Sequence, residues 1–377
     1  MINKKLKVGN VPNLRFPEFT EEWETKKLGE VATNVMYGMN AAATNYDGEN
    51  QYIRITDIDE QTRLFCPNPL SSPDGELDNK YLLHKGDILF ARTGASVGKS
   101  YLYNDKDGKI YFAGFLIRLN VRDEDPYFIF SQTLTEKYQR WVLTMSMRSG
   151  QPGINAEEYK LLPIVIPSIQ EQEKISSFLL LIDERIQTQN KIIGQLETLI
   201  KGLCQKLILK QVPNKKLSDC VSCYSSSLTE SNVIDKNGVY PVYGATGVIA
   251  FTENPQINED AVLIIKDGSG VGKVQFGADK FSVIGTLNYL TAKSEINLRY
   301  IFFCLKFFNF EKYKVGSGIP HIYFKDYGES TIFCPSSEEQ DKIEKLLSTI
   351  DEKINIEKKS LQKYEIQKKY LLQNLFI

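Results

Sequence analysis

The chain has 377 residues, of which 42% are hydrophobic and 25% charged, and its formal net charge is −1 at pH 7. It is long enough for two globular domains of ordinary size, and it contains no apolar run long enough to span a membrane. The start, MINKKLKVGN, lacks the apolar stretch of a signal peptide, so the sequence argues against a secreted or membrane protein and favours a cytoplasmic one.

The first distinctive stretch is a glycine loop in ARTGASVGKSYLY, residues 91–103. It resembles a phosphate-binding loop, but three residues separate Gly94 from Gly98 where that motif has four. The flanking segments are rich in β-branched and aromatic residues, whereas a phosphate-binding loop leads into a helix. A second copy, AVLIIKDGSGVGKVQFG at residues 261–277, has Val274 where a magnesium-binding hydroxyl would be needed. Both loops are therefore predicted to close β-hairpins.

The two glycine loops belong to a longer internal repeat. The sequence that begins at Ser149 aligns without a gap with the sequence that begins at Ser317, at an offset of 168 residues (317 − 149). Upstream, the offset is 174 residues between Lys99 and Lys273 (273 − 99). The chain is therefore predicted to consist of two tandem units that share one plan and differ by insertions in their globular parts.

Each unit is predicted to end in a long helix. A serine that follows a proline, Ser168 or Ser336, stands three residues before a glutamate, Glu171 or Glu339, which is the pattern of a capping box. Beyond it, apolar residues recur with the 4-3 spacing of a coiled coil. The predicted seam positions are Ile175, Leu179, Ile182, Ile186, Gln189, Ile193, Leu196, Ile200, Leu203 and Leu207, and Ile343, Leu347, Ile350, Ile354, Glu357, Leu361, Tyr364, Lys368, Leu371 and Leu375.

The connection between the helices favours an antiparallel pair. Pro213 ends the first helix, and a parallel pairing would require the second globular unit to carry the chain back along roughly 60 Å of helix. Polar residues within the seam, Gln189, Glu357 and Lys368, would lower stability and fix the register.

The expected fold class is α+β, with two globular domains, each a mixed sheet with helices. Two long helices separate these domains and form an antiparallel coiled coil, so that the molecule has an approximate twofold axis and the form of a dumbbell. The predicted globular domains are residues 1–167 and 211–335, and the predicted helices are residues 168–210 and 336–377.

Signatures of catalysis are missing from the sequence. Cys220 and Cys223 form a lone CxxC pair, and the two histidines, His84 and His321, do not complete a zinc site or indicate a catalytic triad. Residues 254–257, NPQI, come nearest to the tetrapeptide of amino-methyltransferases but lack its second proline and its aromatic residue. The sequence therefore predicts a binding protein and no enzyme.

An ordered set of motifs runs through nearly the whole chain: VPNLRFPEFTEEWETKKLGEV, GDILFARTGASVGK, YPVYGATGVIAF, IIKDGSGVGK, and the proline-capped helix starts IPSIQEQEKI and CPSSEEQDKI. This set resembles the specificity subunit of type I restriction-modification systems. The resemblance implies sequence-specific binding of double-stranded DNA, with each globular domain recognising one half of a bipartite, asymmetric site. It also implies that the helices set the gap between the half-sites and hold two methyltransferase subunits, and that restriction/translocase subunits join the complex. S-adenosylmethionine, ATP and Mg²⁺ would then belong to the partner subunits.

A net charge of −1 is unfavourable for a lone duplex binder, because neutralising phosphates usually supplies much of the affinity. Basic residues are therefore expected on one face of each unit, unless partners contribute the positive charge. Lys99 and Lys273 are predicted to contact phosphates beside their glycine loops, and Gln151 is suited to adenine. The candidate DNA-binding residues are Tyr37, Arg54, Arg92, Gly94, Lys99, Arg118, Arg148, Ser149 and Gln151 in the first unit, and Tyr243, Lys266, Gly268, Lys273, Ser317 and His321 in the second.

Two alternatives stay open at this level. The chain could be a coiled-coil adaptor whose globular ends bind proteins, or, less favoured, a nucleotide-binding enzyme that uses the Gly94–Lys99 loop. Each candidate residue could also be an ordinary exposed side chain of a sheet or turn.

Overall fold

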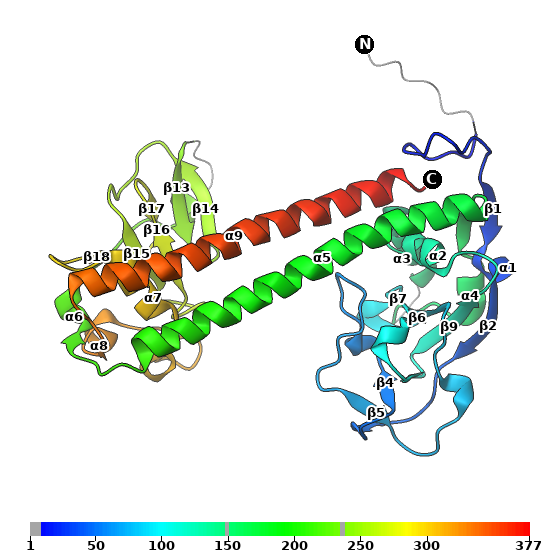
Figure 1. Cartoon of the computed structure of the whole chain (residues 1–377), viewed down its shortest axis with the longest axis horizontal. Helices are drawn as coiled ribbons and strands as arrows, with labels where there is room; N and C mark the ends of the chain where they lie inside the picture. The colour runs from blue at the N-terminus through cyan, green and yellow to red at the C-terminus, as the bar shows by residue number, and fades with distance from the viewer. Residues whose placement is uncertain (1–8, 148–150, 234–237) are drawn as a thin grey trace, which may run out of the picture. The chain divides into compact units, whose positions relative to one another are not determined.

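The computed structural model describes residues 9–147, 151–233 and 238–377. The chain divides into two compact units: unit 1 is Met1–Gln187 with Gln362–Ile377, and unit 2 is Thr188–Leu361 (Figure 1). Both units combine sheets with helices, which confirms the predicted α+β class. Each compact unit contains part of both long helices, whereas the sequence divided the chain into four consecutive segments.

The elements follow one another in chain order. The first half of the chain contains β1 (Glu24–Lys27), α1 (Leu28–Val31), β2 (Ala32–Tyr37), β3 (Ala43–Asn45), β4 (Gln51–Ile53), β5 (Ser71–Pro73), β6 (Asp87–Ala91), β7 (Ser100–Leu102), β8 (Ile110–Phe112), β9 (Leu116–Val121), α2 (Pro126–Gln132), α3 (Glu136–Ser146), α4 (Ala156–Lys160), β10 (Pro163–Ile166) and α5 (Ile169–Cys204). The second half contains β11 (Lys215–Lys216), α6 (Leu217–Cys220), β12 (Val221–Ser225), β13 (Tyr240–Gly244), β14 (Gly247–Thr252), β15 (Ala261–Ile265), β16 (Val274–Gly277), β17 (Ser282–Val283), β18 (Leu287–Ala292), α7 (Leu298–Lys306), α8 (Phe324–Tyr327), β19 (Thr331–Ile332) and α9 (Ser337–Asn374).

A four-stranded antiparallel sheet of the same order forms the centre of each unit. The order is β2-β9-β6-β7 in unit 1 and β12-β18-β15-β16 in unit 2. Strands β6, DILFA, and β15, AVLII, are buried at every residue, so both faces of these two strands are covered. Each unit also has a parallel pair of strands, β4 with β8 or β13 with β17. The internal repeat of the sequence is therefore a repeat of structure.

The two glycine loops join antiparallel strands, β6 with β7 and β15 with β16. This confirms the predicted hairpins. A strand follows each loop where a phosphate-binding loop needs a long helix, so the helix dipole and the free amides of that motif are missing from both places.

The two long helices bury the predicted seam. Every predicted seam position is buried or half-buried, from Ile175 in α5 to Leu207 just beyond it and from Ile343 in α9 to Leu375 just beyond it. In unit 2, Ile200 and Cys204 of α5 share a core with Ile343 and Leu347 from the beginning of α9, whereas the earlier residue of α5, Gln189, lies beside Glu357. The direction of the pairing is therefore antiparallel. Within the described residues, no helix combines the length and apolarity needed to cross a bilayer.

The polar residues of the seam find polar partners. In unit 2 the side-chain amide of Gln189 donates to the backbone carbonyl of Glu357 at 3.3 Å and to its carboxylate. In unit 1 the ammonium of Lys368 lies 2.6 Å from a carboxylate oxygen of Asp183. Gln189 and Glu357 occupy the same position in the two repeats, so their contact marks a local twofold axis of the helix pair. A buried polar contact of this kind fixes the register of a coiled coil.

In unit 1 the glutamate of the predicted capping box, Glu171, makes a tertiary contact with the N-terminal segment. Both carboxylate oxygens of Glu171 accept hydrogen bonds at 2.7 Å from the guanidinium of Arg15, and Glu171 is 1% exposed. The glutamate therefore holds the N-terminal segment against α5, a tertiary contact that competes with the local one.

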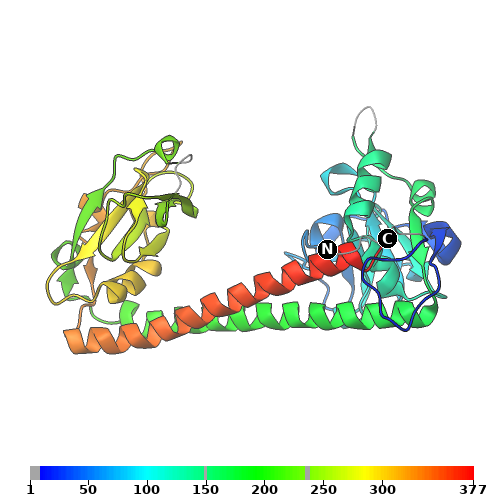
Figure 2. The same cartoon turned by 90° about the horizontal axis from the view of Figure 1, so that it is seen from above.

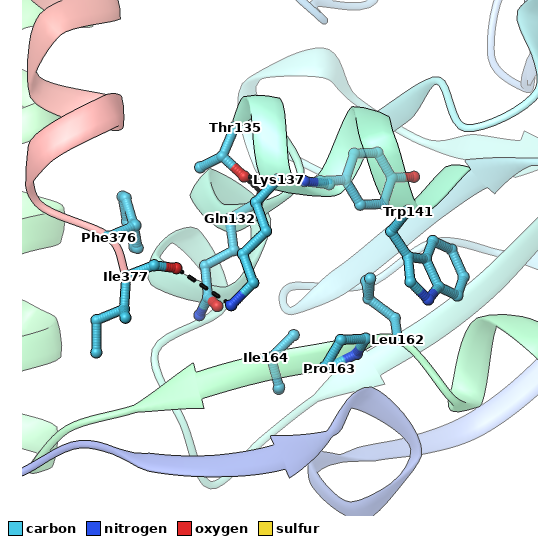
Figure 3. A pocket seen from close by; sticks show the side chains of 10 residues that line it. Gln132, Thr135, Lys137, Trp141, Leu162, Pro163, Ile164, Phe376 and Ile377 are labelled. Carbon is cyan, nitrogen blue, oxygen red and sulfur yellow. Dashed lines mark hydrogen bonds between the residues drawn. The ribbon is translucent and has the colours of Figure 1, made fainter. Parts of the chain in front are cut away.

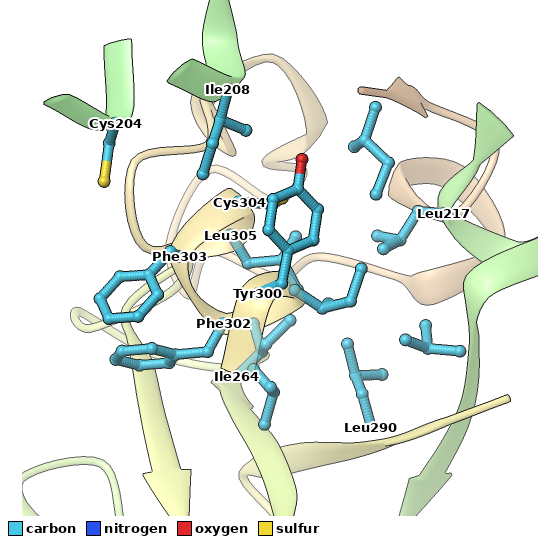
Figure 4. Close-up of a cluster of buried hydrophobic side chains, with 14 of the residues drawn as sticks. Cys204, Ile208, Leu217, Ile264, Leu290, Tyr300, Phe302, Phe303, Cys304 and Leu305 are labelled. Atoms are coloured by element: carbon cyan, nitrogen blue, oxygen red, sulfur yellow. The ribbon is translucent and has the colours of Figure 1, made fainter. Parts of the chain in front are cut away.

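The core of unit 2 lies between its sheet and the two long helices. Figure 4 shows Tyr300, Phe302 and Phe303 of α7 in the same cluster as Cys204, the last residue of α5, and Ile208, which follows it. In Figure 2, α7 lies between the strands and the first turns of α9, and the ammonium of Lys306 is 2.5 Å from Asp351 of α9. Thus α7 connects the sheet to the helix pair.

The end of α9 is part of the core of unit 1. The ring centroid of Phe376 lies 5.2 Å from that of Phe128 and 6.4 Å from that of Trp23. Figure 3 shows Phe376 and Ile377 at a small pocket beside α3, where Lys137 donates a hydrogen bond to the carbonyl of Ile377 at 3.2 Å. The last residues of the chain therefore complete the first unit.

We expect Phe376→Ala to lower the free energy of unfolding of unit 1 by about 3–5 kcal/mol, because it removes a buried ring and leaves a cavity. Both tryptophans of the chain, Trp23 and Trp141, lie in unit 1, so tryptophan fluorescence during urea unfolding reports this unit alone. Ile366→Ala, at an exposed position of the same helix, is the matched control and should change stability by less than about 0.5 kcal/mol. Equal effects of the two substitutions would contradict the packing of the C-terminus on unit 1.

Candidate nucleic-acid interface

Each glycine loop is hydrogen-bonded to a second loop further along the chain, which contains Pro152 in unit 1 and Pro320 in unit 2. In unit 1 the amide of Gly94 donates to the carbonyl of Pro152 at 3.1 Å, and Thr93 forms a β-bridge with Gly153. In unit 2 the amide of Gly268 donates to the carbonyl of Pro320 at 3.0 Å, and Asp267 forms a β-bridge with His321. Both units therefore present the same pair of loops together. The second loop is described from Gln151 onward in unit 1, so Arg148 and Ser149 lie outside the described residues.

Several amides of each glycine loop are already used within the loop, which argues against a phosphate cradle. In unit 1 the amides of Val97, Gly98 and Lys99 donate to the carbonyls of Gly94, Ala91 and Ser96, and the second copy repeats these three hydrogen bonds. Packing explains the second glycine of each loop. Gly98 has φ of +84°, and a Cβ there would come within 2.6 Å of Val142. Gly272 has φ of +87° and would meet Phe310 at 2.8 Å.

Arg92 is the centre of a cationic and aromatic cluster at one end of the unit 1 sheet. Its guanidinium carbon lies 5.0 Å from the ring centroid of Tyr37 and 5.8 Å from that of Phe115, distances typical of cation–π contacts. Phe115 is 60% exposed and Tyr37 41%. The Nε atom of Arg92 is buried without a hydrogen-bond partner among the described residues. The aromatic rings thus hold an arginine that has hydrogen-bonding capacity left.

Arg54, Gly94 and Gln151 lie near this cluster. A hollow of about 440 Å³ is lined by Arg54, Thr93 and Phe115 among others. The guanidinium of Arg54 makes two hydrogen bonds of 2.8 Å to the carboxylate of Asp57, so its charge is neutralised locally. Gln151 is exposed and lies beside Gly94: a Cβ added to Gly94 would be 3.4 Å from the side-chain amide nitrogen of Gln151. The structure therefore brings most of the described candidates of unit 1 to one place.

Lys99 and Arg118 are exceptions, since both side chains lie in the interior. Lys99 is 7% exposed, and its ammonium lies 3.2 Å from the carbonyl of Ile58 and 2.6 Å from the carboxylate of Glu60. Arg118 is 2% exposed, its guanidinium lies 3.7 Å from Asp87, and burial lowers its pKa. Neighbouring chain segments enclose both cations in this structure, so their role as DNA contacts stays a prediction.

Unit 2 places a different set of side chains at the equivalent position. Lys266 donates to the hydroxyl of Ser225 at 3.2 Å. Nδ1 of His321 lies 2.5 Å from a carboxylate oxygen of Asp267, and its ring stacks with Tyr323 at 6.5 Å between centroids. Strands β2 and β12 occupy the same place in their sheets and end at Tyr37 and Ser225. The contact of Arg92 with Tyr37 in unit 1 is therefore replaced by the contact of Lys266 with Ser225.

The remaining candidates of unit 2 differ in their exposure. Lys273 and Ser317 are exposed, and no partner holds the ammonium of Lys273 within the described residues. Tyr243 is half-buried on β13, and its ring packs edge-on against Phe281 with 5.6 Å between centroids. It does not correspond to Tyr37, although both precede a glycine in the sequence.

Sequence analysis missed Phe115, Ser225, Asp267 and Tyr323. Asp267 follows Lys266 directly, and Tyr323 comes two residues after His321. Both could therefore have been found from their closeness in sequence to predicted DNA-binding residues. Phe115 and Ser225 lie far along the chain from their basic partners, and only the pairing of strands brings them there. Within residues 9–147, 151–233 and 238–377, no group of three or more His, Cys, Asp or Glu side chains is placed to hold a metal ion.

We expect the two loop lysines to behave differently when replaced. Lys273→Ala should weaken binding to all duplexes similarly and reduce the slope of log K against log salt by about one, because an exposed ammonium is lost. Lys99→Ala should leave this slope unchanged and lower the stability of unit 1, because its ammonium bonds to the interior. Salt titrations of duplex binding, together with tryptophan-detected unfolding, separate the two effects. A reduced slope for Lys99→Ala would show that this side chain reaches phosphate after all.

The family match and the similar proteins all belong to type I restriction-modification systems. A family described as "Type I restriction modification DNA specificity domain" matches residues 20–198 and 210–365. The type I restriction enzyme MjaVIII specificity subunit of Methanocaldococcus jannaschii is 23% identical over an alignment of 412 positions, gaps included. This alignment covers 95% of this chain and 92% of that protein.

Two solved structures are similar in fold. The S subunit of a type I restriction-modification system from M. genitalium is 18% identical, with a TM-score of 0.72, and the match covers 97% of this chain and 99% of that chain. A chain from a structural study of complex assembly in the type I system is 17% identical, with a TM-score of 0.51, and the match covers 94% and 96% of the two chains.

Proposed function

Because this chain belongs to the family of type I restriction-modification DNA specificity domains, we propose that it is the specificity subunit of such a system and binds double-stranded DNA sequence-specifically. One observation carries the proposal. The two units present a basic residue at the same point of the same scaffold, and surround it with different side chains. A scaffold that is repeated in the two units but carries different surface side chains suits two half-sites of different sequence.

The chemistry of each cluster suits the edges of base pairs in the major groove. Arginine and lysine donate to the acceptors of guanine, glutamine pairs with adenine, and a carboxylate accepts from cytosine. Unit 1 offers Arg92 and Gln151, and unit 2 offers Lys266, Asp267 and His321. The exposed Lys273 supplies phosphate contact without sequence preference. Each half-site is therefore recognised by the loop pair of one unit.

The helices offer a surface for the partner subunits. Apolar side chains that face away from the seam are exposed on both helices: Leu180, Leu181, Leu199, Ile356, Ile366 and Tyr370. A partner protein that packs along the helices would cover these apolar side chains. Two methyltransferase subunits dock there, restriction/translocase subunits join them, and the helices set the gap between half-sites. Catalysis then belongs to the partners, with S-adenosylmethionine, ATP and Mg²⁺ bound by them.

Selection from random-sequence duplexes tests the proposal. The methyltransferase subunit should be present, because a chain with a net charge of −1 needs positive charge from its partners to bind DNA tightly. The expected result is two specified blocks of different sequence separated by a gap of fixed length without preference. Enrichment of a single block would contradict the assignment of one half-site to each unit. No enrichment at all would favour an adaptor that binds proteins through its globular ends.

A further inference from the structure

The N-terminal arm, residues 10–23, covers one face of α5 in unit 1. Arg15 makes its two hydrogen bonds to the buried carboxylate of Glu171 at 2.7 Å. The ring of Phe16 packs edge-on against Phe178, with 6.1 Å between centroids, and the ammonium of Lys174 lies 4.8 Å from the Phe16 centroid. The footprint of the arm on α5 is therefore a glutamate, a lysine and an apolar residue on consecutive turns.

The same footprint recurs in α9 at the offset of 168, as Glu339, Lys342 and Leu346. All three residues are exposed, and Leu346 is 46% exposed. Lys342 pairs with Glu338 of its own helix at 2.7 Å. Unit 2 has no segment equivalent to the arm, because the chain reaches β11 at Lys215 soon after its first long helix ends. The second footprint is therefore uncovered among the described residues.

The surroundings of the two footprints are otherwise alike. The buried amide side chains of Gln172 and Gln340 each donate to the carbonyl of the proline before the helix, at 2.9 Å in both units. Each also accepts from the backbone amide of the residue that caps an earlier helix, Asp125 before α2 at 3.0 Å or Asn297 before α7 at 2.9 Å. The helix start and its anchoring are thus repeated, and the arm is the difference.

We propose that this face of α9 is a docking surface for a segment of a partner protein in which an arginine precedes an aromatic residue, as Arg15 precedes Phe16 in the arm. The arginine forms a bidentate pair with the carboxylate of Glu339, which is the strong geometry for two such groups. The aromatic ring covers Leu346 and receives the ammonium of Lys342. Charge and apolar contact both match the template that the chain itself provides.

The arm of a second copy of this chain is a poorer occupant. Its Arg15 already bonds to a glutamate that is 1% exposed, and removing it would leave a buried, unpaired carboxylate. The inference does not depend on the proposed recognition of DNA, because the footprint and its template are contacts between polypeptide segments.

The test titrates the full chain with a labelled synthetic peptide of residues 10–23, NVPNLRFPEFTEEW, and follows fluorescence anisotropy. We expect saturable binding that Glu339→Arg and Leu346→Ser each weaken at least about tenfold, or about 1.4 kcal/mol. Glu352→Arg and Ile356→Ser, which change exposed residues of the same kinds further along α9, are matched controls and should not alter binding. A peptide with Arg15→Glu should lose binding to the original chain and regain it with the Glu339→Arg chain.

Three results would overturn the proposal. Binding that is equally strong to the Glu339→Arg chain would place the peptide elsewhere, for example on α5 in exchange for the arm. Absence of saturation up to about 1 mM would mean that the footprint has no useful affinity for this chemistry. Self-association of the chain that the peptide abolishes would identify a second copy as the occupant. Because all four positions are exposed, thermal unfolding should be unchanged, which excludes misfolding as a cause.

Discussion

Removing one heptad from each long helix, residues 190–196 together with 358–364, should shorten the gap in the recognised DNA and leave both half-site sequences intact. The deletion keeps the seam in phase, but if the helix ends keep their contacts with each unit, the antiparallel register shifts by one heptad and Gln189 no longer faces Glu357. Each helix loses about 10 Å at about 1.5 Å per residue. Since a base pair of duplex DNA occupies about 3.4 Å, the gap should shrink by at most about three base pairs.

Affinity should fall at the same time. Every base pair removed from the gap turns one half-site by about a tenth of a turn relative to the other, and the units must follow this rotation by twisting. The methylation pattern of cells that carry the shortened subunit measures both effects. Deleting five residues from each helix is the control, because it breaks the seam and should abolish modification. If modification persists at the original spacing after the heptad deletion, something other than these helices sets the gap.

Exchanging unit 1 for that of another specificity subunit should change one half-site completely and leave the other unchanged. The reason is that each loop pair is built within a single compact unit. The two units also differ in length between shared landmarks, 71 residues from Leu28 to Lys99 (99 − 28) and 56 from Leu217 to Lys273 (273 − 217). The duplex selection described above, repeated with the chimera, is the measurement.

The structure determines which residues must be exchanged together to replace unit 1. A replacement of residues 12–167 alone would separate Arg15 from Glu171, and Trp23 and Phe128 from Phe376. We therefore expect a stable chimera when residues 362–377 and the start of α5 are exchanged as well, and a less stable one when they are not. Altered recognition of both half-sites by the longer chimera would contradict the independence of the units.

The sequence by itself determined the repeat, the two hairpins and the helix seam. These features depend on local periodicity, because a strand or helix that buries one face shows it in residues two, three or four apart. The antiparallel direction followed from chain connectivity. Arg92 and Lys266 were found as basic residues next to glycine loops, and the structure places both at the same end of equivalent sheets.

Only the tertiary structure decided which charged residues are available to a partner. Lys99 and Lys273 hold the same position in the repeat, yet Lys99 is enclosed because the longer first unit brings Ile58 and Glu60 over it. Glu171 and Glu339 also hold the same position, and the arm buries only the first. Burial of a charge depends on segments far away in the chain, so equal local sequence gives one interior cation and one that is free to bind phosphate.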